Sequence, residues 1–211
     1  MISRASKFMK VEIGLAAIVF AIAGCSSILE PRPDPTKFYV LTATSESAAP
    51  NAASAKSGGA SLGLGPVNLP AYLDRPEVVT RATPNRIELS RVDRWGEPLR
   101  ENFVQVLSRD LAAKLGTQRI AIYPWYDTTP IDLQVQVDVY HFEADAQGKV
   151  QLTAKWTIID AGGKGALYTD ESNITQTAKP GDATDTAAAL SRAVNELSGS
   201  IATQVTRLRS Q

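Results

Sequence analysis

Few side chains in this chain of 211 residues could perform acid–base, nucleophilic or metal chemistry, because it has one histidine and one cysteine. A Ser–His–Asp triad would have to use the single histidine, His141, whose place in a strand-like stretch favours a structural role. The segment Gly162–Gly165 (GGKG) lacks the Gly-x-x-x-x-Gly-Lys-Ser/Thr pattern of a phosphate-binding loop and is typical of a turn between strands. We therefore expect no catalytic residues, no metal site and no bound cofactor.

The single cysteine, Cys25, lies at the end of an N-terminal segment typical of an export signal. Three basic residues precede an apolar run over residues 13–23, which is shorter than the roughly 20 residues of a membrane-spanning helix. The residues Ile22–Cys25 resemble the signal of bacterial lipoproteins, in which a diacylglycerol is attached to the cysteine thiol. We predict that residues 1–24 are a lipoprotein signal peptide that is removed, and that Cys25 carries a covalent lipid. The alternative is a secreted protein with an incidental cysteine.

The residues after Cys25 predict a destination and a tether. Ser26 resembles the second residue of lipoproteins sent to the outer membrane of Gram-negative bacteria. Residues 25–37 contain alternating prolines, which favour an extended tether of roughly 35–40 Å. Without residues 1–24, the chain keeps 19 basic and 21 acidic side chains. This balance favours neither nucleic acid nor an anionic lipid surface as a partner.

Hydrophobic patterns divide residues 38–211 into strands and two helices. Short strands are expected at 38–42, 62–67, 76–82 and 86–90, and a three-stranded antiparallel meander begins with the alternating stretch 131–139 (IDLQVQVDV). The apolar phase changes at Tyr140, which indicates a bulge. Helical patterns cover 98–115 and 182–208. We expect a disordered loop at about 43–60. The predicted fold class is α+β, a largely antiparallel sheet with two long helices packed on one face.

Two loop-like stretches contain residues suited to contact a partner. Trp95, Trp125 and Tyr126 lie in such stretches, where an aromatic side chain either covers the core or touches another protein. The segment AYLDRPEVVTR mixes both charges around a proline, which fits an interface or a set of local salt bridges. The residues that we predict for a partner interface are Tyr72, Asp74, Arg75, Trp125 and Tyr126.

Several segments taken together resemble a known family. In chain order they are FYVL, YLDRPEVVTR, RWGEPLRENFVQVLSRDLAAKL, VDVYHFEADAQGKVQLTAKWTIID and ALSRAVNELSGSIA. This combination is similar to the ABC-type transport auxiliary lipoprotein component family, also called PqiC/YmbA-like lipoproteins. The resemblance covers nearly all of residues 38–208. It implies a role in lipid traffic across the envelope of Gram-negative bacteria, and it implies no catalytic residues.

The resemblance implies partners as well. Family members act with MCE-domain proteins, and through them with inner-membrane ABC or PqiA-like components. We expect a non-enzymatic lipoprotein anchored at the outer membrane that docks the periplasm-spanning MCE protein. Because MCE proteins form rings, a ring-shaped homo-oligomer is also implied. One alternative is a periplasmic lipid-binding carrier, which would need a deep apolar pocket. Another is a periplasmic hydrolase, which would depend on His141.

Overall fold

The computed structural model describes residues 33–44, 61–126, 130–162 and 165–210. The chain divides into two compact units, Met1–Pro35 and Thr36–Gln211. The predicted signal peptide, the predicted lipidation site Cys25, most of the predicted tether and most of the predicted loop at about 43–60 lie outside the described residues. Pro33–Pro35 have no regular secondary structure. The fold described below is therefore that of the second unit.

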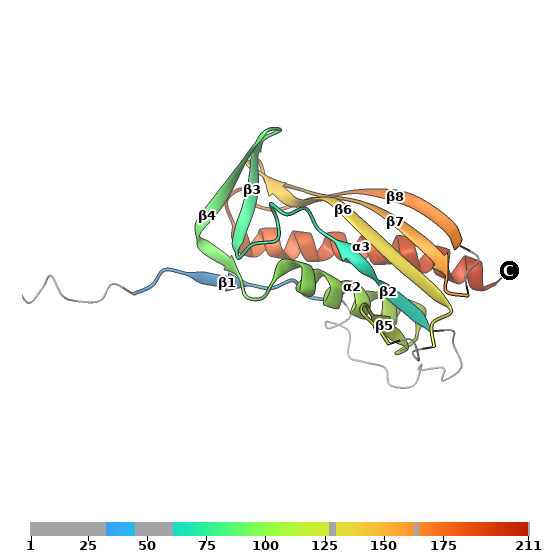
Figure 1. Cartoon of the computed structure of the whole chain (residues 1–211). Helices are drawn as coiled ribbons and strands as arrows, with labels where there is room; N and C mark the ends of the chain where they lie inside the picture. Colours follow the sequence, from blue (N-terminus) through green and yellow to red (C-terminus); the bar gives the residue numbers. More distant parts are fainter. Residues whose placement is uncertain (1–32, 45–60, 127–129, 163–164, 211) are drawn as a thin grey trace, which may run out of the picture. The chain divides into compact units, whose positions relative to one another are not determined.

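The described part of the second unit contains eight strands and two helices (Figure 1). In chain order they are β1 (Lys37–Tyr39), β2 (Leu62–Asn68), β3 (Glu77–Thr83), β4 (Arg86–Trp95), α2 (Leu99–Leu115), β5 (Ile120–Ile122), β6 (Leu133–Asp145), β7 (Lys149–Asp160), β8 (Gly165–Thr177) and α3 (Ala183–Arg209). The sequence patterns predicted all of these elements except β5, and they made β4 too short.

Strand β6 organises the sheet, because three other strands pair with it. Antiparallel β7 lies along one edge of β6, and β8 follows β7. The other edge is shared: β2 occupies its first half, and β3 joins at its end through the pairs Thr80–Ala144 and Arg81–Asp145. Beyond β2 lies β5, and beyond β3 lie β4 and β1. The path across the sheet thus begins at β1 and ends at β5.

The prediction of a largely antiparallel sheet was wrong, because the sheet is mixed. Four of its strand pairings are parallel and three are antiparallel. The predicted meander of β6, β7 and β8 is confirmed, since short turns join neighbours directly. Strands β3 and β4 also form an antiparallel hairpin, whereas the four parallel pairings join strands that are not consecutive in the chain. Alternation along a strand determines which of its faces is buried, but it does not determine which strand lies beside it.

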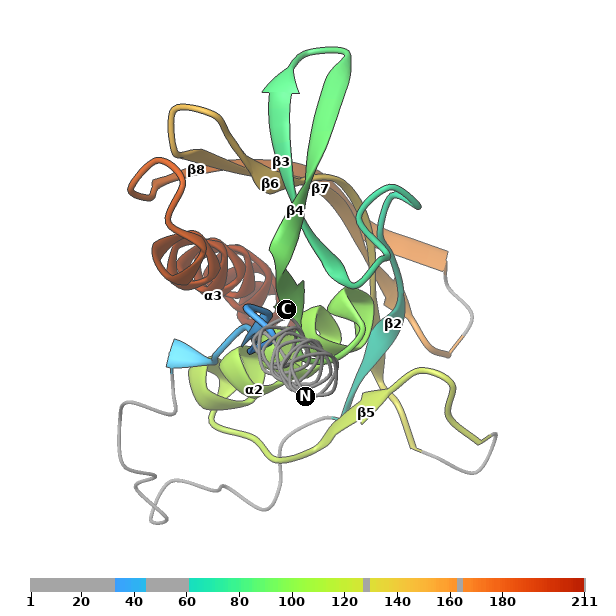
Figure 2. The same ribbon diagram turned by 90° about the vertical axis from the view of Figure 1, so that its left-hand side faces the viewer.

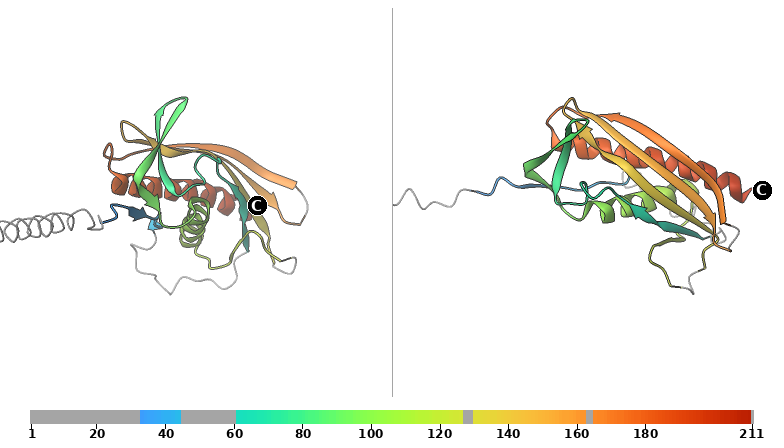
Figure 3. Two further views of the ribbon diagram at one scale, coloured as in Figure 1. Left: turned by 60° about the vertical axis from the view of Figure 1, so that its left-hand side comes forward. Right: turned by 45° about the horizontal axis from the view of Figure 1, so that its top comes forward.

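Both helices lie on one face of the sheet, as predicted (Figures 1 and 2). Helix α2 contacts β2 and β5, helix α3 contacts β7 and β8, and the helices contact each other. Helix α2 ends at Gly116, which adopts the left-handed conformation with φ 62°. Helix α3 begins where the Asp182 carboxylate accepts hydrogen bonds from the backbone N–H groups of Thr184 and Asp185. Figure 3 shows the long strands of the meander running across α3.

The core fills the space between the sheet and the two helices. The predicted bulge in β6 is confirmed, since the register with β7 shifts between Val139 and His141 and leaves Tyr140 unpaired in the ladder. The shift returns Phe142 to the core, where its ring packs edge-on against Phe103 of α2 at 5.1 Å between centroids. The bulge therefore lets one long strand keep contact with α2 beyond the change of phase.

Candidate partner-binding surface

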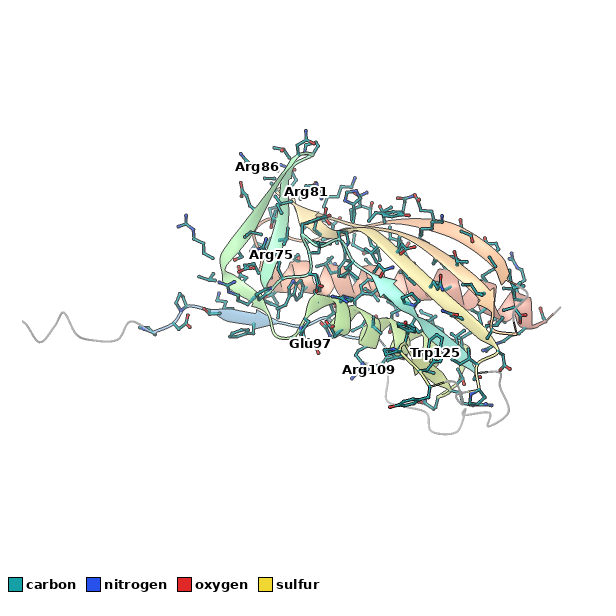
Figure 4. The ribbon with its side chains drawn as sticks, viewed as in Figure 1. Arg75, Arg81, Arg86, Glu97, Arg109 and Trp125 are labelled. Carbon is teal, nitrogen blue, oxygen red and sulfur yellow. The ribbon has the colours of Figure 1, made fainter. Side chains whose placement is uncertain are left out.

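The five predicted interface residues occupy two separate places. Tyr72, Asp74 and Arg75 lie in the segment that joins β2 to β3, whereas Trp125 and Tyr126 follow β5. Figure 4 shows Arg75 near the base of the β3–β4 hairpin and Trp125 well apart from it, in the region of β2 and β5. The structure thus divides the predicted set into two groups with different surroundings.

Tyr72 belongs to a polar cluster around the carboxylate of Glu143, on β6. The Glu143 side chain is only 3% exposed and accepts hydrogen bonds from Arg81 Nε at 2.5 Å and from the Tyr72 hydroxyl at 3.1 Å. It also accepts one from the backbone N–H of Phe142 at 2.7 Å, and His141 Nδ1 lies 3.1 Å from it. Burial, together with the nearby Glu143 charge, raises the pKa of Tyr72 to about 12. Tyr72 therefore stays protonated as a donor.

The Glu143 cluster stabilises the place along β6 where the neighbouring strand changes from β2 to β3. Arg81 reaches it from β3, and Tyr72 reaches it from the segment that precedes β3. The two side chains also contact each other: Arg81 Nη2 donates to the Tyr72 hydroxyl at 2.8 Å, and the guanidinium lies 5.3 Å from the ring centroid. His141 lies at the border of this cluster, partly exposed. These contacts give His141 and Tyr72 a part in positioning the β2–β3 connection.

Asp74 and Arg75 are held by ion pairs. Asp74 pairs with Arg100 at the start of α2. Arg75 Nε lies 2.9 Å from Glu77, which also pairs with Arg94 of β4. Hydrogen bonds from Arg75 and Arg94 lower the pKa of Glu77 to about 2. The salt-bridge alternative for this segment is therefore confirmed, and a partner would meet Asp74 and Arg75 with their geometry already fixed.

A hollow of about 370 Å³ lies beside these ion pairs. Trp95 is buried and forms part of its wall, so the core interpretation is correct for this tryptophan. The hollow is lined by Asp74, Arg75, Pro76, Trp95, Glu97 and Pro98. It lies between the β2–β3 connection and the residues that immediately precede α2.

Trp125 and Tyr126 differ in exposure. Trp125 packs over β2 at Gly63, where an added Cβ would lie 3.0 Å from the Trp125 ring. Its ring also meets that of Tyr123 edge-on at 5.4 Å. Tyr126, in contrast, is 84% exposed, and Tyr123 is also exposed. Trp125 therefore supports a short aromatic segment (Tyr123–Tyr126), from which the two tyrosines face solvent.

A second hollow, of about 400 Å³, lies between this aromatic segment and α2. Its walls include Tyr123 and Pro124 on one side and Arg100 and Glu101 on the other. Arg100 is the ion-pair partner of Asp74, which lines the first hollow. Arg100 therefore links the two hollows, since it lines the second one and pairs with a residue that lines the first.

The chain contains one Gly-x-Ser-x-Gly pattern, at residues 59–63, which the sequence reasoning missed. Its serine, Ser61, is buried just before β2, and its Oγ lies 3.3 Å from Asp132 Oδ2. Leu62 pairs with Leu133, so His141 lies eight residues further along β6, about 26 Å away at the usual rise of a strand. Ser61 and His141 therefore do not form a catalytic pair.

The part of the chain that the structure describes was also considered for a metal site and for a membrane-spanning helix. There, no three histidine, cysteine, aspartate or glutamate side chains are grouped in a way that could hold a metal ion. Within the same residues, neither helix is both long and apolar enough to cross a membrane.

The comparison with protein families gives the class of the protein. Residues 39–202 match the model described as ABC-type transport auxiliary lipoprotein component. The match begins in β1 and ends in α3, so it spans nearly the whole second unit. The protein is thus a lipoprotein that assists a transport system. More particularly, the chain belongs to the ABC-type transport auxiliary lipoprotein component family, which confirms the resemblance seen in its sequence.

Solved structures support the fold. A crystal structure of an uncharacterized protein has 17% identity and a TM-score of 0.65, covering 81% of this chain and 98% of its own. A Xanthomonas campestris protein of the DUF330 family has 16% identity and the same TM-score, covering 83% and 98%. A PelC dodecamer from Paraburkholderia phytofirmans has 12% identity and a TM-score of 0.41, covering 68% of this chain and 86% of its own. Among curated proteins, none matches the chain.

Proposed function

We propose that this lipoprotein is the outer-membrane component of an MCE/ABC-type, PqiABC-like system for intermembrane lipid transport. In this role it is not an enzyme. A lipid on Cys25 holds it at the outer membrane, with its domain in the periplasm. The domain docks the periplasm-spanning MCE protein, and through it contacts inner-membrane ABC or PqiA-like components. Family membership supports the auxiliary role in transport.

One observation carries the docking role: the second unit has a tether end and an aromatic end. The chain enters the unit at β1, and the exposed tyrosines of the aromatic segment follow β5. Figure 1 shows β1 and β5 toward opposite ends of the unit, and they are also the first and last strands of the path across the sheet. The tether therefore enters the unit at one end of this strand path, and the aromatic segment follows the strand at its other end.

The aromatic end has the chemistry of a docking surface. Tyrosine and tryptophan contribute most often to the energetic centres of protein interfaces. Here Trp125 and Tyr123 are fixed before binding, because Trp125 packs on Gly63 and the backbone N–H of Tyr123 donates to Leu64 O at 2.9 Å. A surface that is ordered in advance loses less conformational entropy on binding. The neighbouring hollow, with Arg100 and Glu101 in its wall, supplies a polar rim.

Site-specific photo-crosslinking in living cells tests this proposal. A photoreactive residue replaces Tyr126 in the full-length lipoprotein, and a matched variant carries it at Tyr140, which is exposed on the sheet. We expect the MCE-domain protein to be captured from position 126 and not from position 140. Capture at neither position would refute the docking role, and capture from 140 alone would refute the aromatic end as its surface.

The lipid-carrier alternative is tested separately by native mass spectrometry of the protein extracted from bacterial membranes. Lipid retained in a defined ratio would favour the carrier, whereas a lipid-free domain would favour docking. Both hollows described above have charged residues in their walls, so neither offers the deep apolar pocket that an acyl chain requires.

A further inference from the structure

Two apolar side chains stand out at the tether end of the second unit. Phe38 is 69% exposed and Val40 is 49% exposed, and among the large hydrophobic side chains that the structure describes only Tyr126 is more exposed than Phe38. Both pack beside Gly96, where an added Cβ would lie 3.2 Å from Val40 Cγ1 and 4.0 Å from Phe38 Cβ. They therefore lie on the same side of the chain and form one apolar patch, the Phe38–Val40 patch.

The exposure of this patch is not the result of a loose strand. Strand β1 pairs with β4 from Lys37–Asp93 to Tyr39–Trp95, and the backbone N–H of Gly96 donates to Tyr39 O at 2.7 Å. The next residue after the patch, Leu41, is buried, and its N–H donates to Asn102 of α2 at 2.5 Å. The fold thus holds two apolar side chains in a fixed position outside the core, which is typical of a surface that meets another apolar phase.

Chain length points to the phase that this patch meets. Lys37 lies only twelve positions after Cys25 in the chain. Even when fully extended, this segment spans at most about 40 Å. The patch follows the tether directly, so a lipid on Cys25 keeps it within reach of the bilayer at all times. Two side chains alone would bind a bilayer weakly, but the anchor makes this contact intramolecular and raises its effective concentration.

Charge also favours an apolar contact over an electrostatic one. Without residues 1–24, the chain has slightly more acidic than basic side chains, so no overall positive field draws the domain to anionic lipids. Lys37 is exposed directly beside the patch, and its long side chain can keep its ammonium among headgroups while its neighbours enter the acyl boundary.

We propose that Phe38 and Val40 insert at the boundary between headgroups and acyl chains of the phospholipid bilayer that holds the Cys25 anchor. The β1 end of the domain then rests on the membrane, and the aromatic end is directed into the periplasm. This inference rests on the lipidation of Cys25 in the proposed function, and it adds a second membrane contact that fixes the orientation of the domain.

The single cysteine makes a direct test possible. Because an acylated Cys25 has no free thiol, a cysteine introduced at Lys37 is the only site for a polarity-sensitive fluorophore, and both patch residues remain in place. The labelled, lipidated protein is reconstituted into phosphatidylethanolamine–phosphatidylglycerol vesicles with or without brominated acyl chains. Two matched variants carry the label at Lys37→Cys together with Phe38→Ser and Val40→Ser, or at Tyr126→Cys.

We expect brominated lipid to quench the label at 37 several-fold more than the label at 126, and the double serine variant to lose this difference. Both serine substitutions are at exposed positions, so the thermal unfolding midpoint should change little. Equal quenching at 37 and 126 would overturn the proposal. So would a label at 37 that becomes shielded from aqueous iodide only when an MCE-domain protein is added, because the patch would then bind protein.

Incorporation of labelled palmitate into the same variants, measured in the bacteria that produce them, separates a failure of the anchor from a failure of the membrane contact. A chain that is not acylated refutes the anchor and, with it, the membrane contact. A chain that is acylated but shows no quenching at position 37 refutes only the contact, and leaves the docking role to its own crosslinking test.

Discussion

Replacing Glu143 by glutamine tests whether the polar cluster on β6 holds the fold together. The carboxylate is almost fully buried and receives hydrogen bonds from Arg81, from Tyr72 and from a backbone N–H. Breaking a buried ion pair by removing one partner costs about 3–5 kcal/mol. Arg81 is partly exposed, so water can solvate its guanidinium, and the glutamine oxygen keeps one acceptor. We therefore expect Glu143→Gln to lower the free energy of unfolding by about 2–3 kcal/mol.

Urea unfolding followed by circular dichroism measures this change, and thermal unfolding gives a second readout. In a unit of this size, each kcal/mol shifts the midpoint by about 2–4 °C, so a decrease of about 5–10 °C is expected. The matched control is Glu88→Gln, since Glu88 pairs with Arg86 on the exposed β3–β4 hairpin at 3.0 Å. A surface pair of this kind contributes about 0–1 kcal/mol. If both variants lost the same stability, the structural role of the Glu143 cluster would be refuted.

Three more predictions concern other parts of the molecule. Tyr72 keeps its proton in the folded protein up to a pKa of about 12, against an ordinary value of 10.0, so the stability that it contributes is complete below pH 10 and is lost as the pH rises through 12. Tyr72→Phe should flatten this decline in unfolding free energy measured across that range, and an unchanged profile would contradict it. Gly63→Ala should destabilise the protein by about 1–2 kcal/mol and alter tryptophan fluorescence, because the new Cβ meets Trp125. Gly199→Ala, in the open middle of α3, should instead stabilise it by about 0.5–1 kcal/mol, and the opposite order in thermal unfolding would contradict both. Finally, Cys25→Ser should abolish incorporation of labelled palmitate, and residual label would refute the anchor.

The sequence predicted those parts of the fold that depend on local patterns. The stop of α2 at Gly116, the start of α3 at Asp182 and the bulge at Tyr140 each follow from a few neighbouring residues, and the structure confirms all three. The mixed sheet could not be predicted in this way, because β2 and β6 are joined in space and are far apart in the chain. Strand β5 was missed because three residues are too short to show alternation.

The candidate surface was predicted only in part, for the same reason. Tyr72 was assigned to an interface, yet its hydroxyl donates a hydrogen bond to Glu143, which is 71 residues away. No local sequence pattern links two residues at this distance along the chain. The proline and mixed charges around Asp74 correctly indicated salt bridges, although the partner Arg100 could not be named. The clearest signal for a contact surface was the aromatic cluster after Pro124. Trp125 and Tyr126 are neighbours in this loop but differ in exposure, because Trp125 packs on Gly63 whereas Tyr126 faces solvent.

If the proposed tether and the proposed partner both hold the domain, the shared edge of β6 has a mechanical consequence. Tension applied between the tether and a partner at the aromatic end would run from β1 through β4, β3, β6 and β2 to β5. Along this route the narrowest junction is that of β3 with β6, where only two residue pairs are in register. The Arg81–Glu143 ion pair crosses the same junction. This ion pair therefore reinforces the strand pairing that has the fewest residue pairs along the route of the applied force.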